Sequence, residues 1–263
     1  MKIDIFDTTL RDGFQQEGIS PSVKDKLEIA KLLDNLGVSF IEGGWPGASP
    51  KEEEFFKKAK LELNLDNAKL VSFGSTRKLT LSVDKDPQVQ ALVDAETEYV
   101  CIVGKSSKLH ITKAIQATVD EAIEMAVDTI NFLVQNKKKV FFDAEHFFDG
   151  YKEDPETSLK ILDAVISTKV ECFVFCDTNG GTLPSEVHEI ISEILRRHCS
   201  LRLYSASYTA SMIRHPDSPI GARSTSAMQP ISCNQWRICR ECSSSMAKRR
   251  QAFQIHSQTH GSR

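Results

Sequence analysis

The chain has 263 residues, and about 250 residues is the typical size of a single α/β barrel, so one large domain is expected. A net charge of −3, with 40% hydrophobic and 26% charged residues, is typical of a soluble cytoplasmic protein and excludes a general affinity for nucleic acid. No apolar run approaches the roughly 18 residues of a membrane span, and the first residues predict a strand and not a leader, so no membrane partner is expected.

Short apolar runs alternate with amphipathic segments through about residue 197, which is typical of βα units around a parallel sheet. The predicted strands cover residues 3–6, 40–41, 69–73, 99–103, 139–142 and 171–175. The predicted helices cover residues 23–35, 51–60, 87–94, 119–135, 155–166 and 184–197. These elements predict an α/β fold over residues 1–197, an incomplete TIM (β/α)₈-type barrel with about six recognisable units.

Three of the seven cysteines, Cys101, Cys172 and Cys176, fall in or directly after these apolar strands. A reduced cysteine in such a place behaves as a small hydrophobic residue, so no disulfide framework is expected.

Residues 198–263 differ from the rest, because they hold clusters of Ser, Arg, His and Cys and no apolar run long enough for a barrel strand. We therefore expect an aberrant or disordered tail. Six strands do not close an eight-stranded barrel.

Three predicted strands end in polar clusters: DTTLRDG at residues 7–13, DAEH at residues 143–146 and CDTNGG at residues 176–181. The carboxyl ends of barrel strands line the active site, so these clusters predict a site at one end of the sheet. The alternative for Arg11 and Asp12 is a solvated surface ion pair, which contributes little. Their position at a strand end favours the site.

Five colinear segments resemble the metal-dependent Claisen-condensing acyltransferases, the family of the isopropylmalate, homocitrate and citramalate synthases. They are DTTLRDG with the following Gln15 and Gln16, IEGGWPG at 41–47, FGSTR at 73–77, DAEHFFDGY at 143–151 and CDTNGGT at 176–182. The second and fourth segments resemble the citramalate branch more than the isopropylmalate branch. That resemblance implies condensation of pyruvate with acetyl-CoA to (R)-citramalate for isoleucine synthesis, in a homodimer. The enzymatic alternative is an isopropylmalate synthase or a related lyase.

The same resemblance implies roles for individual residues. Asp12 would be a ligand of a divalent metal, Mg²⁺, Mn²⁺ or Zn²⁺, that chelates the keto acid. Arg11 would bind the substrate and polarise its keto oxygen. Glu145 would support enolisation and hold the arginine, and Thr178 would hydrogen-bond the substrate carboxylate. The structural alternatives are a salt bridge at the barrel mouth for Glu145 and a helix cap for Thr178, and His146 is expected to support the site without binding metal.

The family's His-x-His pair after strand seven and its GERxGNA segment after strand eight do not occur in this sequence. One carboxylate binds a divalent ion poorly by itself, so we expect the chain as written to be catalytically weak or inactive. An inactive barrel fragment that acts as a binding module is therefore the alternative outside the enzymes.

Two explanations of the tail stay open. Codons for residues 234–242, read one nucleotide later, can encode INGEYAGNA, which resembles the family's TINGxGERxGNA region and indicates a shifted reading frame. The other explanation is a zinc site, because Cys239, Cys242, His256 and His260 have the spacing of a zinc finger.

Overall fold

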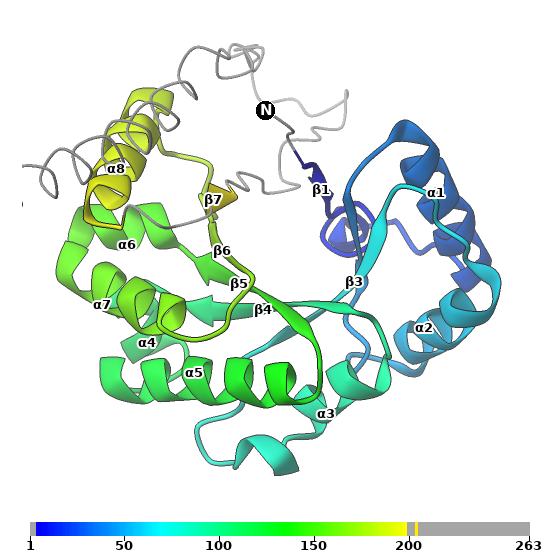
Figure 1. The fold of residues 1–263 in the computed structure, drawn as a ribbon, viewed down its shortest axis with the longest axis horizontal. Coiled ribbons are helices and arrows are strands. Elements are labelled where there is room, and N and C mark those ends of the chain that lie inside the picture. The colour runs from blue at the N-terminus through cyan, green and yellow to red at the C-terminus, as the bar shows by residue number, and fades with distance from the viewer. Residues whose placement is uncertain (1–3, 199–202, 205–263) are drawn as a thin grey trace, which may run out of the picture. The chain divides into compact units, whose positions relative to one another are not determined.

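The computed structural model describes residues 4–198 and 203–204, and these belong almost entirely to one compact unit, Met1–Leu195 with Ser200–Ile213. The centre of this unit is a parallel sheet in which each strand pairs with the next strand along the chain (Figure 1). The strands are β1 (Phe6–Asp7), β2 (Phe40–Gly44), β3 (Lys69–Ser75), β4 (Tyr99–Lys105), β5 (Lys139–Glu145), β6 (Cys172–Phe175) and β7 (Leu203–Tyr204). Sequential parallel pairing with helical connections is the order of a (β/α) barrel.

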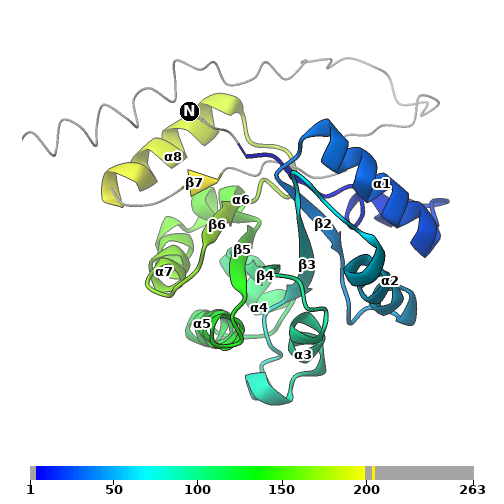
Figure 2. The ribbon, with the colours of Figure 1, turned by 45° about the vertical axis from the view of Figure 1, so that its right-hand side comes forward.

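The main helices follow the predicted ones closely. They are α1 (Val23–Leu36), α2 (Pro50–Glu62), α3 (Pro87–Asp94), α5 (Val119–Gln135), α7 (Pro155–Ile166) and α8 (Pro184–Arg197). In the turned view of Figure 2, helices α1, α2, α3, α5 and α7 lie on the outer side of the strands. The predicted incomplete parallel α/β barrel with six βα units is thus confirmed. No helix in residues 4–198 combines the length and apolar character needed to cross a membrane.

Two short helices that the sequence did not predict follow the carboxyl ends of central strands: α4 (Lys108–Lys113) and α6 (Phe147–Glu153). Each has only six or seven residues, which is too few for a helical period to stand out from the sequence. Two 3₁₀ turns, η1 (Gly13–Gln15) and η2 (Val83–Lys85), complete the described elements.

The sheet also continues past residue 197, where the sequence predicted no further strand. β7 pairs in parallel with β6, with Leu203 beside Phe173 and Tyr204 beside Val174. A strand of two residues leaves no apolar pattern in the sequence, and its pairing comes from the open edge of β6. The rest of the predicted tail, including both the 234–242 segment and the proposed zinc ligands, lies outside the described residues.

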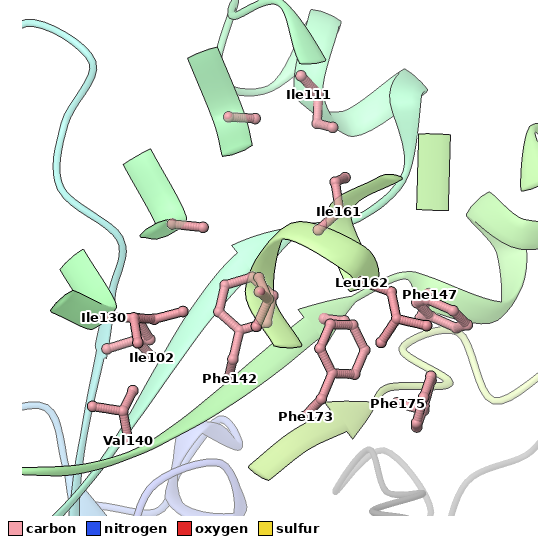
Figure 3. Close-up of a cluster of buried hydrophobic side chains, with 14 of the residues drawn as sticks. Ile102, Ile111, Ile130, Val140, Phe142, Phe147, Ile161, Leu162, Phe173 and Phe175 are labelled. Carbon is pink, nitrogen blue, oxygen red and sulfur yellow. The ribbon is translucent and has the colours of Figure 1, made fainter. Parts of the chain in front are cut away.

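The outer face of the sheet packs against the helices through two apolar clusters, and Figure 3 shows the larger one, which includes residues of β4, β5 and β6. Phe142 of β5 and Phe173 of β6 have ring centroids 5.6 Å apart, and both side chains are buried beneath α5 and α7. Ile130 of α5 and Leu162 of α7 are fully buried in the same cluster. Burial of each such side chain stabilises the fold by about 1.5–3 kcal/mol.

The inner face begins with a cluster of aromatic rings near the amino ends of the strands. The Phe141 ring of β5 lies 5.8 Å from Phe6 of β1 and 5.1 Å from Phe40 of β2, measured between centroids. Strands β1 and β5 are not neighbours in the sheet, so this contact requires the sheet to curl. Side chains alternate along a strand, so Asp143 and Glu145 lie on the same inner face as Phe141, closer to the carboxyl end.

Candidate active site

Arg11 and Asp12 lie in a tight turn directly after β1. The backbone N–H groups of Arg11, Asp12 and Gly13 all donate to the carbonyl oxygen of Thr8, at 3.1, 2.9 and 3.1 Å. This turn fixes the direction of both side chains at the carboxyl end of the strand, as the sequence predicted.

The guanidinium group of Arg11 has three contacts. Its Nε donates to Oε2 of Glu42 at 2.6 Å, its Nη1 donates to Oδ1 of Asp12 at 3.2 Å, and its Cζ lies 4.0 Å from the ring centroid of Phe73. Burial opposes the charge of Arg11, but the carboxylates of Glu42, Asp12 and Asp143 outweigh it and raise the arginine pKa. The site therefore holds a fixed positive charge at every working pH.

Glu42 is the partner of Arg11, and the sequence interpretation gave it no role. Its side chain is fully buried, and burial, reinforced by the nearby charges of Asp143 and Asp12, raises its pKa to about 7 against the opposing effect of Arg11. A glutamate inside an apolar strand was the available signal, because charged residues are almost never fully buried unless paired.

Glu145 pairs with Lys105 and not with Arg11. The two residues stand directly opposite each other at the ends of β5 and β4, so their side chains share one face and form an ion pair. The role that the resemblance implies for Glu145, to support enolisation and hold the arginine, stays a prediction.

Thr178 follows β6 and contacts the start of α6. Its Oγ1 accepts a hydrogen bond from the backbone N–H of His146 at 2.8 Å, and the next amide, that of Phe147, donates to the carbonyl oxygen of Cys176 at 3.2 Å. Two of the amides at the start of α6 are therefore satisfied by the segment after β6. The Thr178 hydroxyl hydrogen is not used in this bond.

His146 adopts the left-handed backbone conformation, with φ of 57°, between the end of β5 and α6. Its ring stacks on the ring of His110, with centroids 3.8 Å apart, and its Nδ1 lies 3.6 Å from Oδ2 of Asp149. Burial and the His146 ring lower the pKa of His110. The supporting role expected for His146 stays a prediction.

Asp143 connects the strand ends electrostatically. Burial raises the pKa of Asp143 to about 6. The hydrogen bond that Cys101 donates to Asp143 and the charge of Arg11 oppose this rise, whereas the charges of Glu145 and Asp12 reinforce it. The pKa of Asp143 therefore depends on Arg11 and Asp12, which follow β1, and on Glu145, the last residue of β5. Thr178 is connected to this region by its hydrogen bond with the backbone N–H of His146, the residue after Glu145.

A cavity of about 330 Å³ opens beside Arg11, and Trp45, Lys26 and Glu52 are among the residues that line it. Glu145 and Thr178 do not line this cavity. The prediction that all four site residues share one cleft therefore remains a prediction.

The three cysteines within residues 4–198 form no disulfide, as expected from the sequence. Cys101 and Cys172 are buried among the inner-face side chains, and Cys176 packs against them.

Parallel strands in sequential order, helices outside them and polar side chains at their carboxyl ends define the domain as a barrel-type α/β domain with a candidate active site. The chain belongs to the HMGL-like family, whose model matches residues 2–221.

The chain is similar to two kinds of curated relatives. It is 50% identical over 196 residues to an (R)-citramalate synthase of Aquifex aeolicus, covering 74% of this chain and 37% of the relative. It is 33% identical over 200 residues to a 2-isopropylmalate synthase of Pyrococcus furiosus, covering 76% of this chain and 38% of the relative. The chain thus spans well under half the length of the relatives that it matches.

Solved structures of similar fold include the HMG-CoA lyase of Bacillus subtilis, with a TM-score of 0.64, 17% identity, and coverage of 78% of this chain and 67% of that one. Another is an HMG-CoA lyase from Acinetobacter baumannii in complex with coenzyme A and 3-methylmalate, with a TM-score of 0.62, 18% identity, and coverage of 77% and 65%. At this identity the likeness shows the fold.

Proposed function

We propose that this domain carries part of the active site of an acyltransferase that condenses pyruvate with acetyl-CoA and water to (R)-citramalate and CoA. The support is the colinear resemblance of the five segments and the 50% identity to the (R)-citramalate synthase of Aquifex aeolicus. Identity to the isopropylmalate synthase is lower, at 33%, so the citramalate reaction is preferred.

The observation that carries the proposal is the fixed guanidinium of Arg11. Its contacts with Glu42, Asp12 and Phe73 hold a permanent positive charge at the carboxyl ends of the strands. When the acetyl enolate attacks the keto carbon of pyruvate, negative charge develops on the keto oxygen. A cation held there in advance stabilises this charge without reorganisation during the reaction.

Glu145 and Thr178 have proposed roles on either side of this cation. Thr178 would donate its free hydroxyl hydrogen to the pyruvate carboxylate, since its oxygen already accepts from the His146 amide. Glu145 would assist removal of a proton from the acetyl methyl group, for which its ion pair with Lys105 must open or pass the proton on.

The family resemblance implies a divalent metal, and Asp12 would be its ligand. In the described part of the chain, the one group of three residues with metal-ligand atoms close together is Glu42, Cys101 and Asp143, and Asp12 is not in it. One carboxylate does not make a site for a divalent ion, so residues 4–198 and 203–204 do not complete the family's metal site around Asp12. The proposal therefore assigns no step to that metal.

Cytoplasmic location, a homodimer, and the absence of nucleic-acid and membrane partners belong to the same proposal. They rest on the composition and on the resemblance.

The test is pyruvate-dependent release of free thiol from acetyl-CoA, followed for the 263-residue chain and for a chain extended in frame with the family's His-x-His segment. We expect little or no release from the chain as written and metal-dependent release from the extended chain. Thiol release with 2-oxoisovalerate in place of pyruvate would instead indicate an isopropylmalate synthase. An extended chain that folds and stays inactive with both keto acids would favour a binding module.

A further inference from the structure

Three side chains that can bind a metal meet on the inner face of the sheet, apart from Asp12. Glu42 comes from β2, Cys101 from β4 and Asp143 from β5, and one ligand atom of each lies within 4.8 Å of the others. These residues are far apart in the sequence, and no spacing motif connects them. The curl of the sheet brings them together.

A second observation concerns a carboxylate oxygen of this triad of Glu42, Cys101 and Asp143. The Glu42 side chain is fully buried, and its Oε2 accepts from Arg11, but its Oε1 has no hydrogen-bond partner in the described part of the chain. A buried carboxylate oxygen without a partner costs on the order of 1–3 kcal/mol or more. A cation beside Oε1 would remove this cost.

The charges of the triad also fit a divalent cation. A thiolate and two carboxylates carry three negative charges, and Arg11, which also contacts Asp12, does not balance them alone, so a divalent ion would bring the site closer to neutrality. In the absence of a cation, protons take that place: Cys101 donates a hydrogen bond to Asp143, and burial raises the pKa of the Cys101 thiol and of both carboxyl groups. Metal binding would therefore displace protons, as at other thiolate sites.

We propose that Glu42, Cys101 and Asp143 form a binding site for a thiophilic divalent cation, Zn²⁺ by preference. Ligand atoms at Zn–S of about 2.3 Å and Zn–O of about 2.0–2.2 Å in a tetrahedron lie within about 4 Å of one another, so the triad would contract from its present separations of up to 4.8 Å. The thiolate selects Zn²⁺ over the hard cations Mg²⁺ and Ca²⁺. Arg11 would keep its bond to Oε2 and orient the ligating carboxylate from outside.

Cobalt(II) is the probe, because it replaces zinc and gives a thiolate-to-metal charge-transfer band only when sulfur is bound. The 263-residue chain is used with serine at the four cysteines that lie outside the described residues. These are Cys199, Cys233, Cys239 and Cys242. The tail's zinc-finger spacing then cannot contribute to the band. We expect one equivalent of Co²⁺ to produce the band, and Zn²⁺ to displace it.

Three further variants in this background identify the cysteine whose sulfur binds the metal. Cys101→Ser should abolish the band, and Cys172→Ser, which changes an equally buried cysteine of the inner face outside the triad, should keep it. Cys176→Ser should also keep it, although the Asp143 and Glu42 charges act on Cys176. Absence of the band from the background chain, or a band that depends on Cys176 and survives Cys101→Ser, would overturn the proposal.

Asp143→Asn provides a test that keeps the thiol. It removes one anionic ligand and should weaken Co²⁺ binding by at least about 10-fold. Circular dichroism identifies variants that do not fold. If Cys101→Ser is among them, X-ray absorption of the zinc-loaded background chain decides the question: one sulfur with oxygen neighbours supports the site, and a shell without sulfur refutes it.

Discussion

The two faces of strand β5 show how one segment meets two different requirements. Its outward residues, Val140, Phe142 and Ala144, are all apolar and buried under the helices. Its inward residues change along the strand, from the aromatic Phe141 to the carboxylates Asp143 and Glu145. The outer face has to pack along its whole length, whereas the inner face packs at one end and keeps charge at the other. A substitution should therefore affect stability on the outer face and charge balance on the inner face.

The largest effect is expected on the outer face. The centroid of the Phe173 ring lies 4.9 Å from that of Phe175 and 5.6 Å from that of Phe142. Phe173→Ala removes this ring and should lower the free energy of unfolding by about 3–5 kcal/mol. Urea denaturation followed by circular dichroism measures this. Leu61→Ala, at a side chain that is 81% exposed, should change it by less than about 0.5 kcal/mol. Similar losses in both variants would contradict the assignment of the core.

On the inner face, Arg11→Lys should leave the fold intact and reduce pyruvate-dependent thiol release by about 10²–10³-fold in the extended chain. Lysine keeps the positive charge, but it cannot donate hydrogen bonds to Glu42 and Asp12 from a planar group or stack on the Phe73 ring as arginine does. Arg197→Lys, at an exposed arginine near the end of α8, is the control. Undiminished turnover in Arg11→Lys would mean that another group stabilises the alkoxide.

Glu42→Gln should change the pH dependence of stability. The Glu42 pKa is about 7 in the folded protein and near 4.5 when unfolded, so the folded state binds more protons between these values. This contribution is fully present below pH 4.5 and is lost as the pH rises through 7, a fall on the order of 3 kcal/mol. The variant should show a smaller fall, because Asp143, whose pKa burial raises to about 6, keeps its own contribution. Urea denaturation between pH 4.5 and 8 measures it, with Glu17→Gln, at an exposed carboxyl, as the control.

The smallest effect is expected at Thr178, where the site contacts α6. Thr178→Val removes the acceptor of the His146 amide and should cost about 1 kcal/mol of unfolding free energy, whereas Thr178→Ser keeps the oxygen and should cost less. The same denaturation experiment compares the two. If the Thr178→Val and Thr178→Ser variants are equally stable, the hydrogen bond to the His146 amide contributes nothing to the free energy of unfolding, and the role of Thr178 lies with the substrate alone.

Local pattern accounts for what the sequence predicted well. Alternation of apolar runs with helical periods located the six βα units, and Pro155 and Pro184 marked the first residues of α7 and α8. The placement of Arg11 and Asp12 after the first strand also followed from the sequence, because a polar run directly after an apolar strand falls at the strand's end. These features depend only on neighbours along the chain.

By itself, then, the sequence determined the parallel α/β architecture and the strand ends at which the polar clusters lie. The tertiary structure decided which charges meet: Arg11 pairs with Glu42 of β2, while Glu145 pairs with Lys105, its cross-strand neighbour. It also decided the meeting of Glu42, Cys101 and Asp143, and the pairing of the two-residue strand β7. The physical reason is that strand register and sheet curvature set distances between residues 30 or more positions apart, and no local pattern encodes those distances.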